Sequence, residues 1–221
     1  MLYPSTCHNL DTLVGGGFPT RAISHIFGEP GSGKTTLGLQ LAVNVIRREK
    51  RVIFIAADPF PGERFAQIAG TDVGSIGQRL LVFEVKSFDQ QRATLRNIKR
   101  IAKENVGLVV LDTATTYYRL EQSKNTETAL QHALVNQLLL LLGLAKKFDL
   151  SVVVTNQVYA DVDTEEVLPV AGYLIDNLSR VVLQFMKIDG GCRRAIVKKH
   201  PLQPRNAHKC FKITGEGLVD A

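Results

Sequence analysis

The residues from 28 to 35 have the types and spacing of a phosphate-binding loop, G-x-x-x-x-G-K-[ST]. Glycines let backbone N–H groups turn toward phosphate oxygens, and the positive end of a following helix adds to the attraction. In such a loop Lys34 reaches the β and γ phosphates of ATP and the Thr35 hydroxyl binds Mg²⁺. A chance glycine-rich turn is the alternative, but an apolar strand precedes this loop and a helical pattern follows it. The residues predicted to bind ATP here are Gly28, Glu29, Pro30, Gly31, Ser32, Gly33, Lys34, Thr35 and Thr36.

A carboxylate follows a second apolar run, Gly107 to Leu111, at Asp112. An acidic side chain delivered by a buried strand beside a phosphate loop can hold Mg²⁺ through water. Alone, such an aspartate is often only a turn or cap residue. Together with the loop, it predicts Thr35 and Asp112 as the residues on the metal side of the site.

Hydrolysis of ATP also needs a group that orients or deprotonates the attacking water. Asp58, just beyond an apolar strand, and Glu63, on the following turn, are the candidates, although Glu63 has the position of a carboxylate that stabilises a helix start. Gln157 ends another buried strand, next to Asn156, at the sheet edge where ligands bind in open α/β folds. We expect Gln157 to sense the γ phosphate, with a plain turn as the alternative. The predicted catalytic residues are Lys34, Asp58 and Gln157.

The elements that must position these residues alternate between β-branched runs and longer helical patterns, which predicts an α/β fold with a mostly parallel central sheet flanked by helices. After about Ser179, shorter alternating stretches predict an antiparallel C-terminal extension. The segment from Tyr159 to Gly172 is too irregular for a simple connection, so we expect a mobile functional loop. The expected strands are 22–27, 51–57, 80–85, 107–112, 151–156, 180–186, 193–199 and 209–213, and the expected helices are 35–49, 61–70, 88–105 and 126–148.

The composition indicates one globular domain spanning residues 1–221, since 45% of the chain is hydrophobic and 22% is charged. Three distant cysteines without a C-x-x-C pair argue against a zinc site or a secreted disulfide framework. The N-terminus does not have the pattern of a signal peptide, and we see no apolar stretch near the ~18 residues of a membrane span. We therefore expect a cytoplasmic protein without a membrane partner.

Basic residues are concentrated in the last third of the chain, where Asp189 is the single acid between Arg180 and Lys212. This asymmetry fits an anionic partner, either nucleic acid or a nucleotide on a neighbouring subunit, or else a solvated basic face. The predicted helix at 88–105 is also basic. Its cations are Arg92, Arg96, Lys99, Arg100 and Lys103.

Five motifs in order along the chain resemble the RecA/RadA recombinase family, and the resemblance spans nearly the whole sequence. The first is a lead-in, LDTLVGGG at 10–17, and the second is AISHIFGE at 22–29, which enters the phosphate loop. The others are LDTAT at 111–115, TNQV at 155–158 and TGEGL at 214–218. The chain most resembles the core-only archaeal paralogues of this family, because the N-terminal helical DNA-binding domain and the subunit-joining linker are not visible.

The resemblance implies ATP and Mg²⁺ as cofactors, with Lys34 and Thr35 as nucleotide ligands, Asp112 beside the metal and Gln157 as the γ-phosphate sensor. It also implies that Arg64 lies by the adenine. Lys198 falls where relatives cover the ATP of an adjacent subunit. The implied partners are single-stranded DNA, a main RadA-like recombinase and a homo-dimer or filament neighbour, in a cytoplasmic, nucleoid-associated setting.

Two departures from the family pattern concern catalysis and DNA binding. The family places a catalytic glutamate within DTEG after the second strand, whereas this chain has Ala56-Ala57-Asp58-Pro59. Because a displacement of ~1 Å can cost about 100-fold in rate, we expect at most a weak DNA-dependent ATPase. The first DNA loop falls near 119–128. The second, near 158–172, carries the acids Asp161, Asp163, Glu165 and Glu166, so we expect the basic helix and the C-terminal third to contact DNA instead.

The sequence leaves three functions open. The first is an ATP-binding recombination accessory protein. The second is a signalling or clock-type ATPase or kinase without a DNA role, and the third is a hexameric helicase-like motor. DNA binding that weakens with salt distinguishes the first from the second, and brisk turnover in rings marks the third. Tyr159 is an exposed stacking candidate for a base, but a lone tyrosine more often covers apolar surface.

Overall fold

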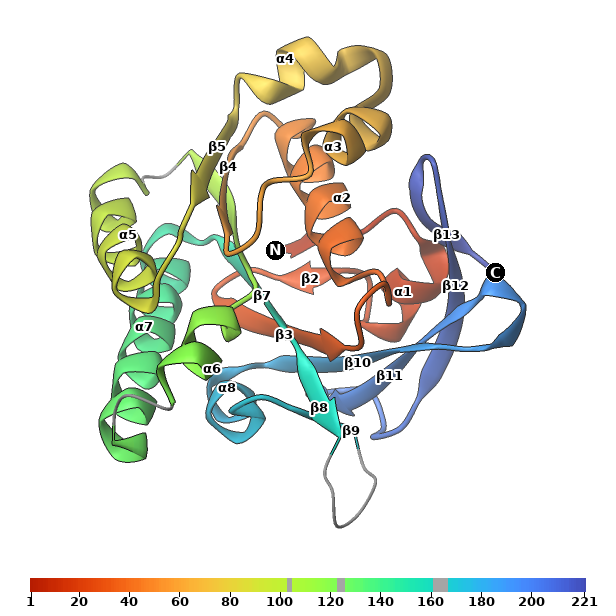
Figure 1. The fold of residues 1–221 in the computed structure, drawn as a ribbon. Helices are drawn as coiled ribbons and strands as arrows, with labels where there is room; N and C mark the ends of the chain where they lie inside the picture. Colours follow the sequence, from red (N-terminus) through yellow and green to blue (C-terminus); the bar gives the residue numbers. More distant parts are fainter. Residues whose placement is uncertain (103–104, 123–125, 161–166) are drawn as a thin grey trace.

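A nine-stranded sheet forms the centre of the molecule (Figure 1). The computed structural model describes residues 1–102, 105–122, 126–160 and 167–221. In spatial order the strands are β13 (Gly217–Asp220), β12 (His208–Thr214), β11 (Arg193–Lys199), β10 (Val181–Lys187), β3 (Ala22–Gly28), β7 (Ser151–Asn156), β6 (Val106–Asp112), β4 (Arg51–Ala56) and β5 (Leu80–Glu84).

The strands from β10 to β5 run parallel, and β11, β12 and β13 continue the sheet in antiparallel pairs. The predicted α/β fold with an antiparallel C-terminal extension is therefore confirmed. One assignment within it is wrong, because β10 belongs to the parallel part through its pairing with β3. Local alternation cannot reveal this, since a strand buried on both faces can pair in either direction.

Helices cover both faces of the sheet, and each face has its own apolar core. On one face lie α1 (His8–Leu13), α2 (Lys34–Ile46), α3 (Gly62–Ala69) and α4 (Val73–Gly77). On the other lie α5 (Phe88–Ile101), α6 (Thr116–Glu121), α7 (Glu127–Phe148) and α8 (Gly172–Leu178). Single 3-10 turns span Gly70–Asp72 and Asp189–Gly191, and a short β1 (Leu2–Tyr3) pairs with β2 (Phe18–Pro19).

The helix α7 is the one helix in the described part of the chain that is long and apolar enough to cross a membrane, and its bounds agree with the helix predicted at 126–148. Its apolar side repeats at helical spacing and is buried at Leu130, Leu134, Leu138, Leu141 and Leu144. These leucines pack in the same core as Val152 and Val154 of β7. One face of the helix is thus buried against the sheet, as in an amphipathic helix that covers a core.

The segment predicted as an irregular loop at 159–172 is partly regular where it is described. Strand β8 (Val158–Ala160) pairs antiparallel with β9 (Val167–Pro169), and α8 begins at Gly172. The four acids predicted to weaken DNA binding, at 161–166, lie outside the described residues, as does Lys103. The predicted strands and helices agree with the structure within a few residues, and α5 ends at Ile101. The short elements α1, α4, α6, α8, β1, β2, β8, β9 and β13 were not predicted.

Candidate nucleotide-binding site

The predicted site residues come from strands whose carboxyl ends meet at one edge of the sheet. Strands β3, β7, β6 and β4 are parallel neighbours, so Gly28, Asn156, Asp112 and Ala56 end side by side. This is the edge at which open α/β sheets bind ligands. Residues separated by more than 120 positions in the sequence are thereby brought to one place.

The phosphate loop wraps around Lys34. Its ammonium donates to the carbonyl oxygens of Gly28 at 2.7 Å and Glu29 at 2.8 Å, and the residue is 7% exposed. Gly33, at the amino end of α2, adopts φ 105° and has no side chain that could cap the first N–H groups of the helix. Ser32 is fully buried, and its hydroxyl has no hydrogen-bond partner among the described residues. The loop therefore presents unsatisfied donors around a cation, which suits a phosphate chain.

Burial shifts the pKa values of Lys34 and Asp112, the two charged residues at the centre of the cluster. It lowers the pKa of Lys34 to about 8, against the opposing effect of the Asp112 and Glu29 carboxylates. Burial also raises the pKa of Asp112, and the hydroxyls of Thr155 and Thr35 and the charge of Lys34 oppose this by stabilising the carboxylate. Thr155 donates its hydroxyl to Asp112 Oδ1. The hydroxyl of Thr35 is thus close enough to stabilise the Asp112 carboxylate, and both predicted metal-side residues lie beside Lys34.

Asp58 lies at the mouth of this cluster. Its side chain is exposed, yet its charge is close enough to Asp112 to raise the pKa of that carboxyl. Ala57, the preceding residue, donates its N–H to the Asp112 carbonyl oxygen at 2.7 Å, which fixes the strand end beside the site. Glu63 is exposed in the first turn of α3, where a carboxylate stabilises the helix start.

Gln157 and Asn156 play different structural parts. Gln157 is half-buried, and its Nε2 donates to Thr116 at 3.5 Å, which in turn hydrogen-bonds Thr113 next to Asp112. Asn156, which we expected at a ligand edge, is fully buried: its Oδ1 accepts from Thr115 and its Nδ2 donates to the Val170 carbonyl at 2.8 Å. Asn156 is therefore a structural residue that ties the start of α6 to the segment before α8.

The remaining predicted residues lie on surrounding elements. The Arg64 guanidinium donates to the carbonyls of Thr214 at 2.5 Å and Gly215 at 3.2 Å, in the turn between β12 and β13. Lys198 is half-buried on β11, and Tyr159 is 42% exposed on β8. Neither belongs to the cluster around Asp112.

A family model described as Rad51 matches residues 2–221. The chain belongs to the Rad51 family. Two similar proteins are described as DNA repair and recombination protein RadB. That of Methanococcoides burtonii is 39% identical over 215 residues, which cover 97% of this chain and 96% of the relative. That of Methanoculleus marisnigri is 39% identical over 211 residues, which cover 94% of this chain and 93% of the relative.

A solved structure described as the crystal structure of the RadB recombinase superposes with a TM-score of 0.86 at 30% identity, covering all of both chains. The predicted resemblance to archaeal paralogues of the RecA/RadA recombinase family is therefore confirmed, and so is the Rad51/RecA-type fold. The residues that fit the ATP and Mg²⁺ implied by a Rad51-family fold are those of the phosphate-loop cluster. Two features of this chain support the fit: the Ser32 hydroxyl is buried without a partner among the described residues, and the Thr35 hydroxyl lies close enough to stabilise the Asp112 carboxylate.

Two cations beside the phosphate loop were not predicted as site residues. Lys187, at the end of β10, donates its backbone N–H to Glu29 Oε1 at 2.9 Å, and Arg193, at the start of β11, donates to the Gly31 carbonyl at 3.4 Å. From the sequence alone, Lys187 and Arg193 are only two of the many basic residues in the C-terminal third. Only the pairing of β10 with β3 brings them to the loop.

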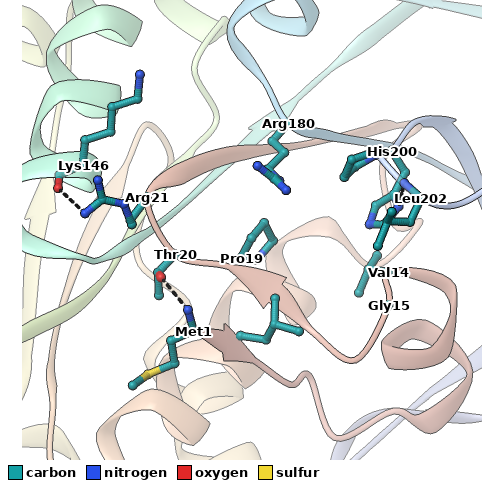
Figure 2. Close-up of a pocket in the computed structure, with 12 residues that line it drawn as sticks. Met1, Val14, Gly15, Pro19, Thr20, Arg21, Lys146, Arg180, His200 and Leu202 are labelled. Atoms are coloured by element: carbon teal, nitrogen blue, oxygen red, sulfur yellow. Dashed lines mark hydrogen bonds between the residues drawn. The ribbon is translucent and has the colours of Figure 1, made fainter.

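A separate cavity of about 420 Å³ lies at the opposite, amino-terminal edge of the sheet (Figure 2). Arg21 and Arg180, which precede β3 and β10, line it together with His200. The His200 Nδ1 accepts the N–H groups of Leu202 at 3.1 Å and Gln203 at 2.9 Å. Because the parallel strands separate the two edges, this cavity has no part in the nucleotide cluster.

Proposed function

We propose that this Rad51-family chain is an ATP-binding, weakly hydrolysing recombinase paralogue that binds DNA and assists homologous recombination and DNA repair. The observation that carries the proposal is the convergence of Lys34, Thr35 and Asp112 at the end of the phosphate-loop strand. Relatives over nearly the full length carry the name DNA repair and recombination protein, which supports the biological role.

In the proposed complex, Lys34 leaves the loop carbonyls and pairs with the β and γ phosphates of ATP, while α2 and the glycine-rich backbone donate N–H groups. Thr35 and Asp112 would hold Mg²⁺, which neutralises the phosphates. Among the described residues no three His, Cys, Asp or Glu side chains cluster as a metal site. This agrees with Mg²⁺ sites that take most ligands from phosphate and water.

Asp58 is the proposed base for weak hydrolysis, since it is exposed at the mouth of the cluster and close to Asp112. Its side chain is one methylene shorter than the glutamate of the family pattern. Gln157 is the proposed γ-phosphate sensor. Its hydrogen bond to Thr116 offers a route from the site to α6 and to β8, which lie next to the two segments where the family pattern places its DNA loops.

The surfaces proposed for single-stranded DNA are α5 and the basic C-terminal strands. On α5, Arg92, Arg96, Lys99 and Arg100 are all exposed, and Arg92 also pairs with Asp89 at 2.8 Å. Such a row of cations releases counterions when it binds phosphates, so binding should weaken as salt rises. A RadA-like recombinase and a neighbouring copy whose ATP Lys198 would cover are the proposed protein partners, in a cytoplasmic, nucleoid-associated setting.

The proposal is tested by measuring ATP hydrolysis with and without single-stranded DNA, and DNA binding with and without ATP, for the unaltered protein and Asp58→Glu. We expect slow hydrolysis, DNA binding that ATP strengthens, and faster hydrolysis in Asp58→Glu because the longer side chain reaches the water. Asp58→Asn is the matched control and should abolish the residual rate.

Two results would contradict this function. Absence of DNA binding at low salt would favour a signalling ATPase or kinase. Rapid hydrolysis in rings would favour a helicase-like motor.

A further inference from the structure

The hairpin of β10 and β11 is fixed against the phosphate loop. Gly28 pairs with Phe185 of β10, and a Cβ at Gly28 would lie 2.1 Å from the Phe185 carbonyl oxygen. Two residues further along β10, the backbone N–H of Lys187 donates to Glu29 Oε1 at 2.9 Å. Two positions of the hairpin, Phe185 and Lys187, therefore lie directly against the first two residues of the loop.

This pairing places the side chain of Lys187 over the tip of the loop. Side chains alternate along a strand, so Lys187 projects on the same side as the buried Phe185, toward the α2 face. The Lys187 Cε and Nζ lie 3.2 Å and 3.4 Å from the position that a Cβ would take at Gly31. Arg193, the cross-strand partner of Lys187, donates from Nε to the Gly31 carbonyl at 3.4 Å.

The hairpin thus adds two positive charges to a loop that already encloses Lys34. The Lys187 charge is near enough to contribute to the lowered pKa of Lys34, which shows that the two ammonium groups repel each other. In the described part of the chain, neither Lys187 nor Arg193 forms an ion pair with a carboxylate. A ligand that carries several negative charges would offset the repulsion between these neighbouring cations.

We propose that Lys187 and Arg193 form a second cationic arm of the phosphate site, which binds the phosphate chain of a nucleoside di- or triphosphate from the hairpin side. This rests on the proposed ATP binding and deepens it. In this arrangement Lys34 binds the phosphate chain from inside the loop, and Lys187 binds it at the loop tip. Arg193 holds the tip in place through its hydrogen bond to the Gly31 carbonyl. A nucleoside monophosphate gains little from the arm because it has no β phosphate at the loop.

The test is calorimetric titration of the full chain with Mg²⁺-ATP, Mg²⁺-ADP and AMP, using Lys187→Met, Lys187→Arg and the control Lys209→Met. Lys209 is an exposed cation of β12 in the same antiparallel extension. We expect Lys187→Met to weaken ATP and ADP binding about fivefold to tenfold, the usual effect of one partly exposed charge contact. Binding of AMP should change less than about twofold, and Lys187→Arg and Lys209→Met should bind ATP like the unaltered protein.

Equal ATP affinity in Lys187→Met and Lys209→Met would overturn the second arm. An equal loss for ATP and AMP would also overturn it, because Lys187 would then act on the whole site and not on the phosphate chain. Both results require that the unaltered protein binds ATP. If the unaltered protein binds no ATP, it is the proposed function that fails. Since Lys187 is exposed, we expect the melting temperature of Lys187→Met to match that of Lys209→Met.

Discussion

Lys34 shows how one buried residue sets the chemistry of the site. Its ammonium is held by two loop carbonyls, and no carboxylate of the described residues forms an ion pair with it. Burial lowers its pKa to about 8. Near neutral pH the residue is charged and ready to pair with phosphate. As pH rises through 8, it loses its proton in the nucleotide-free protein. Phosphate binding favours the charged form, so affinity must follow this titration.

We therefore expect the affinity for Mg²⁺-ATP to fall about tenfold between pH 7 and pH 9, because each unit above the free-state pKa costs one factor of ten. Titrations at several pH values measure this slope. Lys34→Arg is the control, since arginine keeps its charge throughout this range and should lose the pH dependence. An affinity that is flat or rises toward pH 9 in the unaltered protein would contradict the assignment.

The sequence predicted Lys34, Thr35 and Asp112 as neighbours because each follows a strand with a strong local pattern. It did not predict that Thr155 donates to Asp112, or that Asn156 is buried with both ends of its amide bonded. These contacts depend on the lateral order of β3, β7 and β6, which no local pattern encodes. The same is true of Lys187, whose role depends on the pairing of β10 with β3.

At the scale of elements, the junction of β3 and β10 controls both the phosphate loop and the hairpin. The expected strands were right because buried parallel strands are continuous β-branched runs. Their ends and the short helices were less predictable. For example, α8 begins at Gly172 through Ala171 in the left-handed region at φ 49°, a conformation that the sequence of that segment does not favour.

Gly28→Ala tests this junction. Its new methyl group would collide with the Phe185 carbonyl, a backbone atom that moves only if β10 separates from β3. We expect a loss of about 2–4 kcal/mol in the free energy of unfolding together with loss of ATP binding. Denaturant unfolding measures the first quantity.

Gly143→Ala is the matched control for that substitution, since it adds the same methyl group on α7, where, beyond the helix's own nearby backbone, no atom of the described residues lies within 4 Å. It should stabilise the protein by up to about 1 kcal/mol. If Gly28→Ala were as stable as the unaltered chain, the close approach of β10 to the loop would be wrong.

In the molecule as a whole, the parallel sheet separates two edges with different linings. The carboxyl edge carries the phosphate loop, Asp112, Asp58 and Gln157. The amino edge holds the cavity lined by Arg21, Arg180 and His200 (Figure 2). The basic character predicted from the sequence is distributed over α5 and the antiparallel strands, away from the buried core. A nucleotide at the carboxyl edge is thus positioned to influence the hairpin and the Gln157 network together.

The central claim is that Lys34, Thr35 and Asp112 form one Mg²⁺-ATP site. Calorimetric titration of ATP into the unaltered chain and Lys34→Ala, each with Mg²⁺ and with a chelator, tests it most directly. We expect one ATP per chain, tighter binding with Mg²⁺, and loss of binding in Lys34→Ala with an unchanged melting temperature. Absence of ATP binding by the unaltered protein at millimolar concentration, or equal binding by Lys34→Ala, would contradict the account.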